Sequence, residues 1–138
     1  MKLYWVKTNS VIKKVFSKFV WDMPNNEKII YLTFDDGPTP EITEWTLAQL
    51  KKHDIKATFF CIGNNVKKHP DIFNKIIEDG HAIGNHTFNH LNGWKTETTA
   101  YIENIKLCED EIRWERGEGR WKMEDGRWEM EDGRWTKM

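Results

Sequence analysis

The chain has 138 residues, with 21 lysines and arginines against 22 aspartates and glutamates, and a formal net charge of -1 at pH 7. This length suits one domain. The balanced charge lacks the basic field that nucleic-acid binding requires, so we expect no nucleic-acid partner. No apolar run approaches the roughly 20 residues of a membrane-spanning helix, and we therefore expect no transmembrane segment.

Residues 1–23 predict a short amphipathic segment. Asn9-Ser10 is suited to cap a helix, and the apolar residues that follow have helical spacing opposite several lysines. These apolar residues are Ile12, Val15, Phe16 and Phe19. Such a helix either packs on the domain, which we favour, or makes weak contact with a membrane surface. The scattered lysines interrupt the apolar region that a signal peptide needs, so a cytoplasmic location is the default expectation.

From residue 28 onward, apolar runs alternate with helical patterns. The predicted strands are residues 28–34, 57–62 and 81–84, and the predicted helices are residues 41–53, 70–79 and 96–112. The first strand is a nearly continuous apolar run, which is typical of a central strand covered on both faces. Gly80 stands where a helix C-terminal cap belongs. This alternation predicts an α/β fold with about three parallel βα units and right-handed crossovers.

Two groups of polar residues lie where predicted strands end. Asp35-Asp36 follows the first strand, and His86 and His90 follow the third. Because the carboxyl ends of parallel strands open on one face, we expect both groups to meet there. Two imidazoles and one carboxylate make a three-ligand set for Zn²⁺ or another first-row metal. A second carboxylate, not ligated, can act as general base on a water molecule, so the pattern predicts a hydrolase site.

The remaining histidines and both cysteines have no predicted role in this site. His53 and His69 lie near predicted helix ends, and His81 opens a predicted strand. Cys61 and Cys108 stand in apolar surroundings and far apart in the sequence. Such surroundings favour buried free thiols over a disulfide or a zinc site.

Three segments resemble the NodB-type polysaccharide deacetylases, a carbohydrate esterase family that removes N- or O-acetyl groups from chitin-like polymers and peptidoglycan. The segments are residues 30–40, which contain TFDDGP, residues 57–66 (ATFFCIGNNV) and residues 80–93 (GHAIGNHTFNHLNG). The resemblance covers roughly residues 10–112. It implies the N-terminal portion of a distorted (β/α) barrel, and it implies an acetylated polysaccharide as the substrate.

The resemblance also implies a role for each residue of the predicted site. Asp35 corresponds to the catalytic base, whereas Asp36, His86 and His90 correspond to the ligands of a divalent metal. We expect Zn²⁺ ahead of Co²⁺ or Mn²⁺. Thr87 occupies the Ser/Thr position of the family's H-[ST]-x-x-H motif. A haloacid-dehalogenase-like phosphohydrolase is disfavoured, because its aspartates stand two residues apart whereas these are adjacent.

Later motifs of the family have no counterpart in this chain. They are an Arg-x-Pro segment, an Asp/Trp segment and a Leu-x-His segment whose histidine serves as general acid. After residue 112 the sequence repeats every seven residues instead, with Arg-Trp at positions 113, 120, 127 and 134. We interpret this repeat as a non-globular tail on a truncated family member rather than as a carbohydrate-stacking array of Arg-Trp pairs.

The expected organisation therefore has three parts. Residues 1–23 form the amphipathic segment, residues 24–112 a partial deacetylase domain, and residues 113–138 a disordered tail. The expected function is a metal-dependent hydrolase that deacetylates N-acetylated sugar polymers. The alternative is an inactive relic that binds metal or carbohydrate, and the sequence leaves the oligomeric state open.

Overall fold

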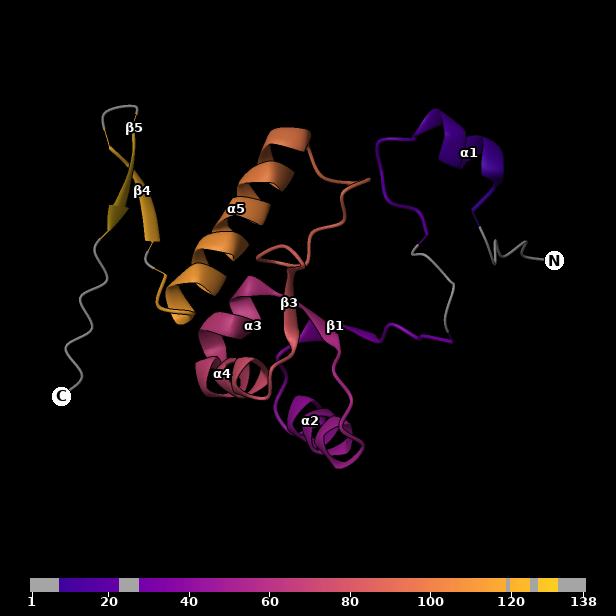
Figure 1. The fold of residues 1–138 in the computed structure, drawn as a ribbon. Helices are drawn as coiled ribbons and strands as arrows, with labels where there is room; N and C mark the ends of the chain where they lie inside the picture. The colour runs from indigo at the N-terminus through magenta and orange to yellow at the C-terminus, as the bar shows by residue number, and fades with distance from the viewer. Residues whose placement is uncertain (1–7, 23–27, 119, 125–126, 132–138) are drawn as a thin grey trace. The chain divides into compact units, whose positions relative to one another are not determined.

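The computed structural model describes residues 8–22, 28–118, 120–124 and 127–131 (Figure 1). Its contacts divide the chain into two units, Met1–Ile30 and Tyr31–Met138.

In the first unit, α1 (Ser10–Val15) begins after Asn9, whose Oδ1 accepts a hydrogen bond from the N–H of Val11 at 2.8 Å. This confirms the predicted cap. The helix is shorter than predicted, because the backbone leaves helical geometry at Phe16.

The second unit contains a three-stranded parallel sheet. Its strands are β1 (Thr33–Gly37), β2 (Thr58–Cys61) and β3 (Ala82–Asn85), in the order β1-β2-β3. α2 (Ile42–Lys52) connects β1 to β2, and α3 (Gly63–Lys68) and α4 (Pro70–Glu78) connect β2 to β3. α5 (Thr98–Glu115) follows β3. The predicted βα alternation with parallel strands is confirmed.

The ends of α4 follow from local sequence. Pro70 occupies the first turn, where its missing N–H costs no hydrogen bond. Gly80 has a φ of 75°, and its N–H donates to the carbonyl of Ile77 at 2.8 Å. A glycine reaches this left-handed conformation without a Cβ clash, which explains why the helix ends here.

The core lies around the central strand β2. Its buried members are Leu47, Leu50, Ala57, Phe59, Cys61, Val66, Phe73, Ile76, Cys108 and Ile112. The rings of Phe34 and Phe59 stack at 5.1 Å, which joins β1 to this core. Cys61 and Cys108 are buried free thiols, as predicted, and burial raises the pKa of Cys61 to about 12. No helix among the described residues is long and apolar enough to cross a membrane.

The first strand differs from the prediction in both its limits and its place. It begins at Thr33 rather than at residue 28, and it lies at an edge of the three-stranded sheet rather than at its centre. Ile30 is 84% exposed and Tyr31 is 60% exposed. Among the described strands β1 pairs only with β2, so its other edge has no strand beside it.

The structure also describes helix and strand within the predicted tail of residues 113–138. α5 continues through Glu115, and β4 (Arg120–Glu124) pairs antiparallel with β5 (Arg127–Glu131). Five-residue strands separated by the dipeptide Asp-Gly account for the period of seven, since this dipeptide is a strong hairpin signal. The register pairs Arg120 with Glu131, Lys122 with Glu129 and Glu124 with Arg127. The fourth Arg-Trp pair lies outside the described residues.

Candidate metal centre

A bulge in β1 sets the direction of Asp36. Asp35 is opposite Phe60 and Gly37 is opposite Cys61, so Asp36 is the extra residue in the register. Its φ of 68° is unusual for a residue with a side chain. A bulge of this kind re-aims a side chain relative to its neighbours. Asn65 of α3 holds the bulge, because its Nδ2 donates to the carbonyl oxygen of Asp36 at 2.9 Å.

The loop after β3 carries both histidines. The N–H of His86 donates to the carbonyl of Cys61 at 3.0 Å, which continues the pairing with β2. The chain then turns through Thr87 and His90, whose φ angles are 62° and 54°. Thr87 is buried, and its Oγ1 accepts a hydrogen bond from the N–H of Leu91 at 3.0 Å. This turn places both imidazoles beside the tip of β1.

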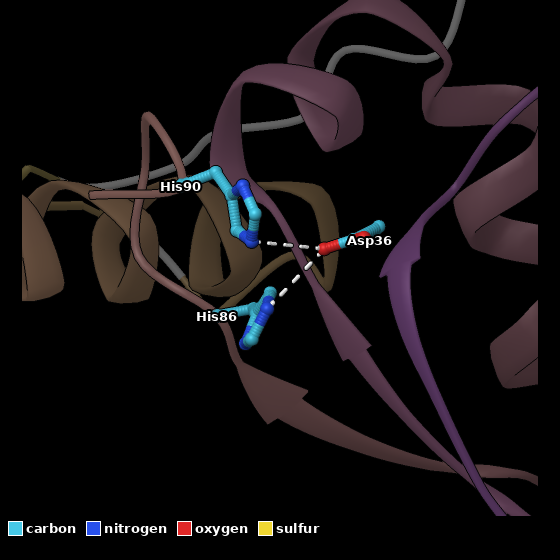
Figure 2. Close-up of side chains that lie close together, drawn as sticks. All are labelled: Asp36, His86 and His90. Atoms are coloured by element: carbon cyan, nitrogen blue, oxygen red, sulfur yellow. Dashed lines mark ion pairs between the residues drawn. The ribbon is translucent and has the colours of Figure 1, made fainter. Parts of the chain in front are cut away.

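The three side chains converge on one point (Figure 2). Asp36 Oδ1 lies 3.3 Å from His86 Nε2 and 3.2 Å from His90 Nε2. One ligand atom from each residue lies within 4.8 Å of the other two. Tetrahedral ligands at Zn²⁺ bond lengths stand about 3.4 Å from each other. The observed spacing and the mixed nitrogen and oxygen donors therefore fit a divalent metal.

Solvent reaches this centre from one side. The side chains of Asp36, His86 and His90 are 60%, 31% and 59% exposed. Three protein ligands on a partly open surface leave coordination positions for water or a substrate, as in catalytic rather than structural metal sites. The structure brings these three residues together at the carboxyl ends of the strands, and their role as metal ligands stays a prediction.

Asp35 is not part of the three-residue cluster. It is exposed on β1, next to Asp36 and opposite Phe60 in the register. Its role as catalytic base stays a prediction.

The other three histidines do not join the cluster. His53 follows α2, and His69 lies between α3 and α4. His81 is buried at the start of β3, where its Nδ1 accepts a hydrogen bond from the N–H of Ala57 at 3.3 Å. Burial lowers the pKa of His81, with Lys56 adding to this shift.

Two asparagines beside the centre were missed in the sequence. Asn65 lies in α3, a helix that the apolar pattern did not predict. Asn104 is buried on α5, one helical turn before Cys108. The available signal was that Asn104 is a polar residue on the core-facing stripe of this helix, four positions before the apolar Cys108.

Comparison with known proteins places the chain among deacetylases. It matches the family model described as polysaccharide deacetylase over residues 22–123. A peptidoglycan-N-acetylglucosamine deacetylase of Bacillus cereus is 51% identical over 71 residues, which are 51% of this chain and 33% of that protein. A chitooligosaccharide deacetylase of Rhizobium leguminosarum bv. trifolii is 39% identical over 88 residues, which are 64% of this chain and 41% of that protein.

Solved structures agree with the sequence matches. A peptidoglycan N-acetylglucosamine deacetylase in complex with 4-naphthalen-1-yl-N-oxidanyl-benzamide has a TM-score of 0.65 at 42% identity, covering 67% of this chain and 43% of that one. The chitin deacetylase of the fungal pathogen Colletotrichum lindemuthianum has a TM-score of 0.58 at 34% identity, covering 63% and 40%.

These matches fix the family but take in only part of each relative. The chain spans 33% of the length of the first of these curated relatives and 41% of the second. The family match nevertheless covers well over half of this chain and includes Asp36, His86 and His90. The chain therefore belongs to the polysaccharide deacetylase family.

Proposed function

We propose that this protein is a metal-dependent hydrolase that removes acetyl groups from N-acetylated sugar polymers of the peptidoglycan or chitin type. The observation that carries the proposal is the convergence of Asp36, His86 and His90 at the carboxyl end of the sheet. The names of the relatives, which are peptidoglycan, chitooligosaccharide and chitin deacetylases, support the choice of substrate.

Asp36 Oδ1 and the Nε2 atoms of His86 and His90 are the atoms that hold the metal in this proposal. We expect Zn²⁺ first, with Co²⁺ or Mn²⁺ as alternatives, because two imidazoles and a carboxylate suit all three ions. A divalent metal bound here would lower the pKa of water towards about 7 and would polarise the acetyl carbonyl. The exposed side of the cluster is where the acetylated sugar approaches.

Asp35 is the general base in this proposal. Its carboxylate takes a proton from the attacking water, whose oxygen adds to the acetyl carbonyl carbon. The C–N bond then breaks, the sugar amine takes up a proton, and acetate leaves. Asp35 directly precedes Asp36 in the chain, so the strand tip supplies one carboxylate to hold the metal and one to move the proton.

Metal uptake by the purified chain tests the ligand assignment. We expect about one Zn²⁺, Co²⁺ or Mn²⁺ per chain, a large loss of affinity in His86→Ala, and none left in His86→Ala/His90→Ala. His53→Ala is the matched control, because His53 lies at the far end of α2 and should leave uptake unchanged. Equal uptake by the wild type and the double variant would refute the assignment.

Asp35→Asn separates binding from chemistry. This variant keeps the size of the side chain but loses the base, so metal uptake should persist while metal-dependent release of acetate from an activated acetyl ester is lost. If Asp35→Asn retained full release of acetate, Asp35 would not be the base.

A second candidate function is metal binding without turnover. All five histidines of the sequence lie in the described part of the chain, and only His86 and His90 belong to the cluster. No further histidine is thus in the cluster to protonate a leaving amine. Uptake of one metal per chain with no metal-dependent release of acetate from any acetyl ester would favour this second function.

A further inference from the structure

Asn104 of α5 contacts the loop that carries both histidines. Its Oδ1 accepts hydrogen bonds from the N–H of Phe88 at 2.8 Å and from the N–H of Asn89 at 2.9 Å. The carbonyl oxygen of Asn104 also lies 3.1 Å from the N–H of Phe88. Phe88 and Asn89 lie between His86 and His90 in the sequence, and the Asn104 residue is only 6% exposed.

The loop needs support from outside its own sequence. Thr87 and His90 have φ angles of 62° and 54°, which residues with side chains rarely adopt. Thr87 is β-branched, so its conformation is especially unfavourable in isolation. Such conformations persist only where surrounding interactions hold them.

That support comes from two sides. From α3, the N–H of Gly63 donates to the carbonyl of Thr87 at 3.0 Å, and the N–H of Asn64 donates to the carbonyl of Phe88 at 2.9 Å. From α5, the Oδ1 of Asn104 accepts hydrogen bonds from the N–H groups of Phe88 and Asn89. The carbonyls of Thr87 and Phe88 are thus bound by α3, and the amides of Phe88 and Asn89 by α5.

We infer that Asn104 is a positioning residue for the metal centre. By accepting both amides, its side chain fixes the turn that brings the Nε2 atoms of His86 and His90 to 3.3 Å and 3.2 Å from Asp36 Oδ1. The inference rests on the proposed function, because it assigns Asn104 to the same centre. Groups that orient metal ligands in this way typically change metal affinity by about 10-fold to 100-fold when removed.

Two substitutions of similar size separate positioning from packing. Asn104→Leu fills the same space without an acceptor, and we expect its Kd for Zn²⁺ to rise by about 10-fold or more. Asn104→Asp keeps an acceptor for both amides, and its Kd should stay within about 3-fold of the wild type. If Asn104 acted through packing alone, Asn104→Asp would have the higher Kd for Zn²⁺ of the two variants, because a buried leucine suits the core better than a buried carboxylate.

Ile112→Ala is the control for loss of stability. Ile112 is buried on the same helix, two turns beyond Asn104, and it belongs to the hydrophobic core. Its truncation should lower the free energy of unfolding without changing the affinity for Zn²⁺. Urea unfolding of every variant, measured alongside the titration with Zn²⁺, shows whether lost affinity merely follows lost stability.

Amide hydrogen exchange gives a readout that needs no metal. The amides of Phe88 and Asn89 should be protected in the wild type and in Asn104→Asp, and the amide of Asn89 should exchange much faster in Asn104→Leu. An unchanged Kd in Asn104→Leu, or unprotected amides in the wild type, would overturn the inference alone. A wild-type chain that bound no Zn²⁺ would overturn the proposed function together with it.

Discussion

Gly63 is the point at which a single added methyl group should disturb the fold and the metal centre together. A Cβ at this position would lie 2.5 Å from Phe88 Cδ2 and 3.0 Å from Cys108 Cα. Non-bonded carbons prefer about 3.5–4.0 Å. In Gly63→Ala the ring of Phe88 must therefore move by about 1 Å, and the backbone of α5 by about 0.5 Å.

The cost can be bounded from these distances. Overpacking of this kind typically destabilises a core by about 1–3 kcal/mol. The better helix propensity of alanine offsets at most about 1 kcal/mol of that. We expect a net loss of about 1–2 kcal/mol in the free energy of unfolding, measured by urea denaturation followed by circular dichroism. Because Phe88 lies between His86 and His90, the affinity for Zn²⁺ should fall as well.

Gly37→Ala is the matched control for Gly63→Ala. Gly37 directly follows the proposed ligand Asp36, but the nearest atom to an added Cβ is Thr43 Oγ1 at 3.7 Å, which is an ordinary contact. Its stability and metal affinity should change little. If Gly63→Ala were as stable as the wild type with unchanged affinity, or if Gly37→Ala were the more damaging substitution, this account of the close approach would be wrong.

Two buried titratable groups provide further tests. Burial lowers the pKa of His81, so protons bind more readily to the unfolded chain, and the free energy of unfolding should fall as pH drops below about 6.5. Urea unfolding across pH 5 to 8 measures this, and His81→Gln should lose that part of the dependence. Burial raises the pKa of Cys61 to about 12, so iodoacetamide at pH 8 should label it far more slowly in native protein than in urea. Equal labelling rates would contradict its burial.

The parts of the fold that the sequence predicted depend on local signals. Pro70 and Gly80 mark the two ends of α4, and each acts through its own backbone conformation. The convergence of the three side chains was predictable because parallel strands bring their carboxyl ends together, which places Asp36 beside His86 without knowledge of the remaining structure.

The parts that were missed depend on distant contacts. The segment Gly63–Lys68 has no apolar stripe, and the amides at its start bond to the carbonyls of Thr87 and Phe88 rather than within the segment. The apolar run before Thr33 predicted a buried strand. Burial of a strand depends on the elements that pack beside it, and a local sequence pattern does not reveal these elements. Asn104 was overlooked for the same reason, since its partners lie 15 and 16 residues earlier in the chain.

We expect the centre to cleave amide and ester substrates at different rates, because the two leaving groups differ in their need for a proton donor. An amine leaves only after its nitrogen is protonated, and a positioned general acid typically contributes about 10²–10⁴-fold. His81 precedes β3 whereas His86 follows it, and at about 3.3 Å per residue the strand separates them by more than about 13 Å. His81 is therefore not placed by the described fold to act as that acid.

We therefore expect the 138-residue chain to cleave an activated acetyl ester weakly and an N-acetylglucosamine oligomer not detectably. An activated ester has a leaving group that departs without prior protonation, so it needs only the metal ligands and Asp35. Release of acetate from both substrates, measured with Zn²⁺ and after removal of metal by a chelator, tests the ranking. His86→Ala/His90→Ala should abolish the metal-dependent part. Robust deacetylation of the oligomer that is lost in Asp35→Asn would contradict this expectation. It would show that a donor other than these histidines protonates the amine. A second copy of the chain would then be the first place to look for that donor.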